Sequence, residues 1–85
     1  MKRKDVMIKH KTGLHARPAS NFVQTAHKFK SDVKIIKDGV EVNGKSIMSV
    51  LTLAATFNTK LTIIVSGEDE DKAIDKLCKI LEEGE

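Results

Sequence analysis

Apolar residues along this 85-residue chain change between two spacings, and this change limits the possible folds more than any other feature of the sequence. Alternation of apolar and polar residues is typical of a strand with one buried face, whereas apolar residues at steps of three and four are typical of a helix. Strand patterns occupy residues 2–9, 32–37, 40–42 and 61–66, and helical patterns occupy residues 16–28, 47–53 and 70–83. The sequence therefore predicts the element order βαββαβα.

Each predicted helix carries one apolar stripe, which needs an apolar surface on which to be buried. One sheet with all three helices on a single face meets this need, so we predict an α+β fold built as a two-layer sandwich. The alternation turns Val33, Ile35, Ile63 and Val65 toward the helices and would leave Ile36 and Ile64 on the opposite, solvated face. There they would form a small apolar patch or an oligomer contact. A chain of this length is expected to form one domain over residues 1–85.

The composition argues for a cytoplasmic protein. The single cysteine, Cys78, cannot form an internal disulfide. No apolar run approaches the ~20 residues that span a bilayer, and the polar N-terminus does not resemble a signal peptide. We therefore expect no membrane insertion.

The charge distribution argues against a nucleic-acid module. Fifteen Lys and Arg against twelve Asp and Glu give a net charge of +3, but the acids gather in the last third of the chain. The sequence has no Trp or Tyr and three Phe, so a platform for stacked bases is not evident. What remains is a modest attraction for acidic or phosphorylated partners.

The most informative segment runs from Gly13 to Ser20 and reads GLHARPAS. It places His15 where a helix beginning at Ala16 would normally have a capping Ser, Thr, Asp or Asn. Pro18 falls in the first turn, where its missing amide hydrogen costs nothing. The amides of Ala16 and Arg17, the positive end of the helix dipole and the Arg17 guanidinium together predict an anion site. A phosphoryl group on a ring nitrogen of His15, which the nearby positive charge would keep neutral, could be stabilised there.

This segment also has interpretations other than anion binding. A histidine beside an arginine in a small basic protein is often no more than a solvated surface pair. His10, His15, His27 and Cys78 lack the compact spacing of zinc ligands, and no set of nucleophile, base and orienting acid can be assembled around His15. Isolated glycines provide no phosphate-binding loop. We therefore expect no metal and no cofactor.

Two separate motifs carry a family resemblance. The segment from Gly13 to Ser20, and Lys45-Ser46-Ile47-Met48 about thirty residues later, resemble HPr, the histidine-containing phosphocarrier protein of the bacterial phosphoenolpyruvate:sugar phosphotransferase system. The resemblance implies an open-faced β-sandwich with a four-stranded antiparallel sheet. It also implies a carrier rather than an enzyme: enzyme I would phosphorylate Nδ1 of His15, Arg17 and the amide of Ala16 would bind the phosphate, and sugar-specific IIA domains would receive it.

The resemblance further implies a docking face on two helices of a monomeric protein. Its members would be Ser20, Gln24, His27, Ile47, Met48 and Leu51. The alternative is core packing for Leu51 and plain solvent exposure for the three polar residues.

Ser46 has two candidate roles. On its own it is most simply the N-cap of the short helix that follows. The doublet Ile47-Met48 after it resembles HPr proteins of the Gram-positive type, in which an HPr kinase/phosphorylase modifies the matching serine. That resemblance implies a second partner as well, a catabolite-control transcription regulator.

Ala54 and Asn58 occupy positions where many family members have glycine, and Gly44 is also unusual. These departures put the affinity for partners in doubt but remove no phosphoryl-accepting group. Three alternatives stay open: a carrier of the nitrogen-linked branch, a regulator that acts through phosphorylated Ser46, and a basic nucleic-acid module. The HPr-related catabolite-repression protein is such a regulator and lacks the active histidine, so His15 argues against this alternative.

Overall fold

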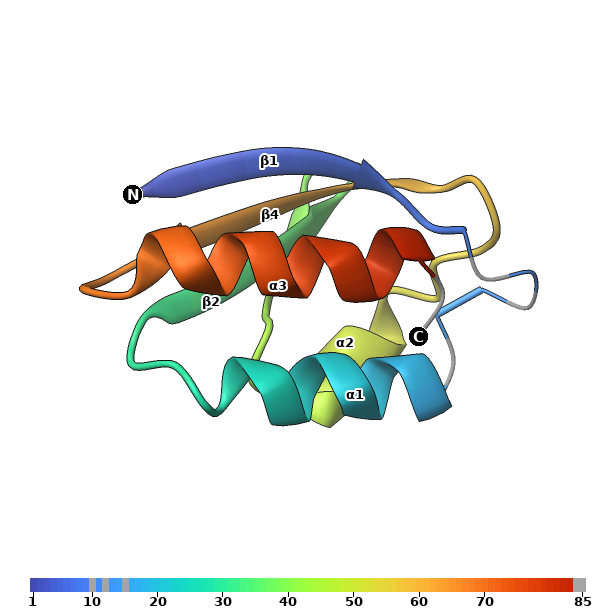
Figure 1. Cartoon of the computed structure of the whole chain (residues 1–85). Helices are drawn as coiled ribbons and strands as arrows, with labels where there is room; N and C mark the ends of the chain where they lie inside the picture. The colour runs from blue at the N-terminus through green and yellow to red at the C-terminus, as the bar shows by residue number, and fades with distance from the viewer. Residues whose placement is uncertain (10, 12, 15, 84–85) are drawn as a thin grey trace.

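The computed structural model describes residues 1–9, 11, 13–14 and 16–83. Its elements, shown in Figure 1, follow the predicted order βαββαβα. They are β1 (Lys2–Met7), α1 (Ala16–Ala26), β2 (Asp32–Lys37), β3 (Val40–Asn43), α2 (Ile47–Thr52), β4 (Lys60–Ser66) and α3 (Glu70–Glu83). The first strand and the first two helices end one or two residues earlier than predicted.

The four strands form one antiparallel sheet in the order β1-β4-β2-β3. β2 and β3 form the hairpin expected from Asp38-Gly39, whose backbone φ angles of 50° and 82° suit a tight two-residue turn. α1 and α3 lie side by side on one face of the sheet (Figure 1), and α1 also packs against α2. The predicted fold class, an open-faced β-sandwich with the three helices on one face, is confirmed.

The core lies between the sheet and the helices. Val33, Ile35, Ile63 and Val65 are all buried, as their alternation predicts. The stripe of α1 is buried against them through Ala19, Phe22, Val23 and Ala26, and that of α3 through Ala73, Ile74, Leu77 and Leu81. Cys78 is also buried, and desolvation raises the pKa of its thiol to about 11, so it is an inert core residue.

The opposite face of the sheet is polar. Ile36 and Ile64 do lie on it, half-buried, and their cross-strand neighbours include Glu41 and Lys34. Lys34 pairs with Glu41 at 3.3 Å, and Lys60 pairs with Asp5 at 3.6 Å on the same face. The predicted orientation of the two isoleucines is confirmed, while their use as an oligomer contact stays a prediction.

α3 is the longest of the described helices, with 14 residues. Neither α3 nor any other helix in the described part of the chain combines the length and apolarity needed to cross a membrane.

Candidate functional site

The first turn of α1 is the centre of the candidate site. α1 begins at Ala16, as predicted, and its first turn contains no acidic residue. Pro18 and Ala19 are buried and anchor this end of the helix to the core, whereas Ala16 and Arg17 are exposed. The helix therefore presents its positive end to solvent beside a guanidinium.

The described groups at this helix end are positively charged or are hydrogen-bond donors. Arg17 forms no ion pair with any described residue, and no described side chain accepts a hydrogen bond from the amides of Ala16 or Arg17. His15 lies outside the described residues, so the predicted role of its ring stays a prediction. The described part of the site can supply backbone N–H donors and the planar fork of an arginine, which suit phosphate oxygens.

The segment before α1 is held by a second loop, the one that follows α2. The amide of the buried Leu14 donates to the carbonyl of Ala55 at 2.8 Å. Gly13 has a φ of +81°, and a Cβ at this position would lie 2.6 Å from the same carbonyl oxygen. The loop is fixed in turn to the end of β1, since the amide of Asn58 donates to the carbonyl of Ile8 at 2.8 Å. Residues 54–59 therefore set where α1 begins.

Ser46 caps α2, as predicted. Its backbone is extended, with φ −114° and ψ 116°, and its Oγ accepts a hydrogen bond from the amide of Ser49 at 3.3 Å. Val50 anchors the helix in the core, while Ile47 and Leu51 are half-buried against it. Met48 is 71% exposed. The Leu51 side chain is thus partly used in core packing, whereas most of Met48 faces solvent.

The three polar residues predicted for the docking face lie along one side of α1 and of the turn that follows it. Ser20, Gln24 and His27 follow each other at steps of four and three, and Gln24 Nε2 donates to Ser20 Oγ at 3.2 Å. His27 Nε2 lies 2.8 Å from the carbonyl oxygen of Lys45, next to Ser46. The structure therefore joins the far end of this α1 side to the beginning of α2.

The three departures from the family pattern differ in how well each residue suits its local backbone. Ala54 and Asn58 both adopt left-handed backbone, with φ angles of 50° and 67°. Asparagine tolerates this region and so replaces a turn glycine as expected, whereas the methyl group of alanine makes it unfavourable. Gly44 is required for lack of space rather than for its backbone angle, because a Cβ there would lie 2.5 Å from Cγ1 of Val33.

Phe57 in the same loop is exposed, which the sequence analysis did not predict. Its ring is 48% exposed, and Lys9 Nζ lies 5.9 Å from the ring centroid. The same ammonium donates to Asn58 Oδ1 at 3.1 Å. Within the described residues, no group of three His, Cys, Asp or Glu side chains is arranged to hold a metal ion.

Comparison with known proteins shows the family to which the chain belongs. A family model described as "PTS HPr component phosphorylation site" matches residues 2–83. This chain belongs to the HPr family. The HPr-like protein Crh of Bacillus subtilis is 48% identical over 83 residues, which cover 98% of each protein. The crystal structure of the phosphocarrier protein HPr from Bacillus anthracis superposes with a TM-score of 0.92 at 41% identity, covering 95% of this chain and 96% of that one.

Membership of the HPr family supports two roles for this chain, a phosphocarrier of the phosphotransferase system or an HPr-like regulator. HPr family proteins carry phosphoryl groups and are not catalysts. The crystal structure of Bacillus subtilis Crh, 48% identical with a TM-score of 0.77 and covering 95% of this chain and 93% of that one, is described as a domain-swapped dimer. That this chain is a monomer therefore stays a prediction.

Proposed function

We propose that this chain is a phosphocarrier of the sugar phosphotransferase system that accepts a phosphoryl group on Nδ1 of His15. The observation that carries the proposal is the exposed first turn of α1, where Arg17 has no ion-pair partner among the described residues and follows His15 by two positions. Membership of the HPr family supports it.

The chemistry asks little of the carrier. As the bond from phosphorus to Nδ1 of the neutral imidazole forms, the bond from phosphorus to the donor breaks, and negative charge is spread over the equatorial oxygens. The amides of Ala16 and Arg17 and the Arg17 guanidinium would balance that charge without reorganising. An exposed helix end is sufficient for this task, and it lets the donor and then the acceptor reach the same phosphorus.

Enzyme I would supply the phosphoryl group, and sugar-specific IIA domains would receive it, in the cytoplasm. The docking face would comprise Ser20 and Gln24 on α1, His27 just after it, and Ile47, Met48 and Leu51 on α2. The 71% exposure of Met48 supports this role, because a large exposed apolar side chain beside polar neighbours suits a transient protein interface.

Phosphorylation of Ser46 by an HPr kinase/phosphorylase would regulate the carrier. A phosphate there would add about 1.5 to 2 negative charges at the beginning of α2, next to the apolar docking face. Enzyme I would then phosphorylate His15 more slowly, and the modified face could bind a catabolite-control transcription regulator.

The alternative is a regulator that acts mainly through phosphorylated Ser46. The 48% identity to Bacillus subtilis Crh favours this second candidate. The histidine at position 15 and the arginine two residues later favour the carrier instead, because a regulator has no need of a phosphoryl acceptor.

Transfer of labelled phosphate from phosphoenolpyruvate through purified enzyme I tests the proposal. The native protein should become labelled, His15→Ala should not, and Arg17→Ala should be labelled more slowly. Phosphorylation of Ser46 by ATP and kinase without any labelling through enzyme I would favour the regulator.

A further inference from the structure

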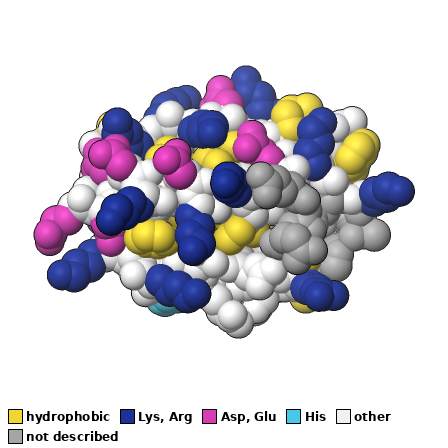
Figure 2. All heavy atoms as spheres, in the orientation of Figure 1, with side chains coloured by type: hydrophobic (Ala, Val, Ile, Leu, Met, Phe, Trp, Pro, Cys, Tyr) yellow, Lys and Arg dark blue, Asp and Glu magenta, His cyan; other side chains and the backbone are white. Residues whose placement is uncertain are grey.

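A recess between α3 and the edge strand β1 has no role in the transfer site. It has a volume of about 680 Å³, is open to solvent and has a predominantly basic lining. Its lining consists of Lys4, Lys72, Asp75, Lys76, Lys79 and Glu82. Figure 2 shows the side of the molecule on which α3 lies in front, where many Lys and Arg side chains reach the surface.

The four lysines of this recess have no ion-pair partner in the part of the chain that the structure describes. Lys4, Lys72, Lys76 and Lys79 form no ion pair with any described residue, although Asp75 and Glu82 line the same recess. On the helix surface Lys76 is a neighbour of both Lys72 and Lys79, because residues three and four apart lie side by side, and Asp75 offsets part of their repulsion. The four lysines outnumber the two carboxylates of the lining, and a bound anion would offset the remaining positive charge.

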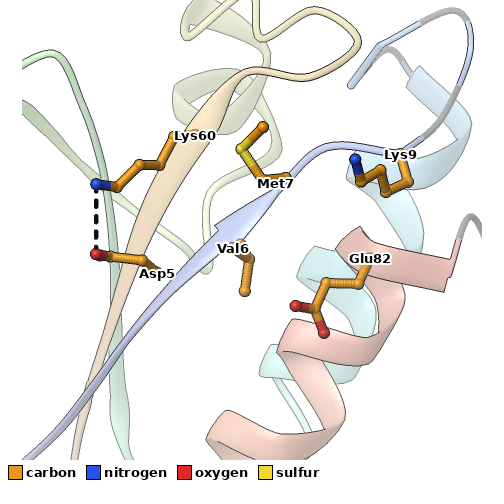
Figure 3. Close-up of a pocket in the computed structure, with 6 residues that line it drawn as sticks. All are labelled: Asp5, Val6, Met7, Lys9, Lys60 and Glu82. Atoms are coloured by element: carbon orange, nitrogen blue, oxygen red, sulfur yellow. Dashed lines mark ion pairs between the residues drawn. The ribbon is translucent and has the colours of Figure 1, made fainter.

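A neighbouring pocket provides the contrast. It encloses about 350 Å³ and is lined by Asp5, Val6, Met7, Lys9, Lys60 and Glu82 (Figure 3). Its two ammonium groups are already engaged, since Lys60 pairs with Asp5 at 3.6 Å and Lys9 donates to Asn58 at 3.1 Å. Unengaged lysines are therefore a property of the α3–β1 recess and not of every hollow in this basic protein.

We propose that the α3–β1 recess docks an acidic peptide segment of a partner protein. Lys72 to Lys79 span about 10 Å along the helix axis, the length of about three residues of extended chain. Carboxylates on such a segment could therefore reach successive lysines, while the aliphatic stems of the lysines contact its backbone.

The composition of the recess disfavours a nucleic-acid partner. Asp75 and Glu82 lie among the lysines and would repel the continuous charge of a nucleic-acid backbone, and the lining contains no aromatic side chain on which a base could stack.

The recess is separate from the proposed docking face. α1 packs against both α2 and α3, and the recess lies on the β1 side of α3. A partner in the recess therefore leaves α2 accessible, and the inference does not depend on phosphoryl transfer.

A titration of the ¹⁵N-labelled protein with a ten-residue peptide of alternating Glu and Ala tests the inference, with a Gln-Ala peptide as the uncharged control. We expect amide shift changes at Lys4 and along α3, weakening as salt is added. Changes centred on Arg17, or spread evenly over all lysines, would overturn the proposal. So would tighter binding of a DNA duplex or of phosphatidylserine vesicles at equal charge concentration.

A matched pair of variants sharpens the test. Lys76→Glu/Lys79→Glu should weaken binding of the Glu-Ala peptide by about tenfold, while Lys28→Glu/Lys30→Glu, which changes the net charge equally, should weaken it less than about twofold. Equal losses in both variants would mean that only net charge matters and would refute the recess. The amide shift changes of the native protein test the proposal even if the variants do not fold.

Discussion

The amide of Leu14 donates to the carbonyl of Ala55 at 2.8 Å and ties the segment before α1 to the loop after α2. Arg17 follows Leu14 by three positions, so this hydrogen bond helps to fix the position of the first turn that would bind the phosphoryl group. Two loops that are distant in sequence therefore build one site.

Gly13→Ala should loosen this connection. The added Cβ would meet the Ala55 carbonyl oxygen at 2.6 Å, and the φ of +81° would be strained as well. We expect a loss of about 2 to 3 kcal/mol in the free energy of unfolding, measured with urea.

Gly39→Ala is the matched control for this prediction. It has nearly the same φ, +82°, but a Cβ there would have no neighbour within 4 Å. Its loss should be limited to about 1 kcal/mol, the cost of the left-handed backbone alone. Equal losses in the two variants would mean that the contact with Ala55 contributes nothing.

Ala54→Gly should stabilise the protein. Ala54 has a φ of 50°, which glycine adopts without steric cost, although glycine also adds freedom to the unfolded chain. The net gain should be about 0.5 to 1 kcal/mol in urea unfolding. Asn58→Gly, at a φ of 67°, should change stability less, because asparagine tolerates this region. A destabilised Ala54→Gly protein would contradict the strain assigned to this position.

Substitutions of Ser46 separate its capping role from its regulatory role. Ser46→Ala removes the acceptor for the Ser49 amide and should cost about 1 kcal/mol of stability. Ser46→Asp keeps a good capping group and should unfold at nearly the native urea concentration, yet it should accept phosphate from enzyme I more slowly. Transfer to Ser46→Asp at the native rate would remove the support for regulation at this residue.

Asp69 should make stability depend on pH. Its carboxylate accepts hydrogen bonds from Ser31 Oγ and from the amides of Lys30 and Ser31, which lower its pKa below the ordinary value of 3.8. The folded protein therefore binds this proton less readily than the unfolded chain. The resulting stability is present above the unfolded pKa and is lost as the pH falls through the folded pKa.

Asp69→Asn should accordingly be less stable than the native protein at about pH 7, and the difference should shrink at about pH 2.5. Urea unfolding at the two pH values measures it. Glu68→Gln is the control, since Glu68 is exposed and has no ionic partner among the described residues. A difference that is independent of pH would show that the carboxylate contributes through shape rather than charge.

Local signals in the sequence were sufficient for much of this fold. Apolar spacing located the elements, Asp38-Gly39 located the hairpin, and Ser46 located the beginning of α2. The candidate site was less predictable, because the contact between Leu14 and Ala55 joins segments about forty residues apart and no local pattern reports it. The recess beside α3 was missed for the same reason, since Lys4 and the α3 lysines are brought together only by the packing of α3 against β1.

The most direct test of the central claim is to locate the phosphoryl group after reaction with enzyme I and phosphoenolpyruvate. NMR of the phosphorylated, ¹⁵N-labelled protein would detect coupling between phosphorus and a histidine ring nitrogen. We predict coupling to Nδ1 of His15 alone, while His27, whose Nε2 lies 2.8 Å from the Lys45 carbonyl oxygen, stays unmodified. Phosphate on His27, or only on Ser46, would contradict the account.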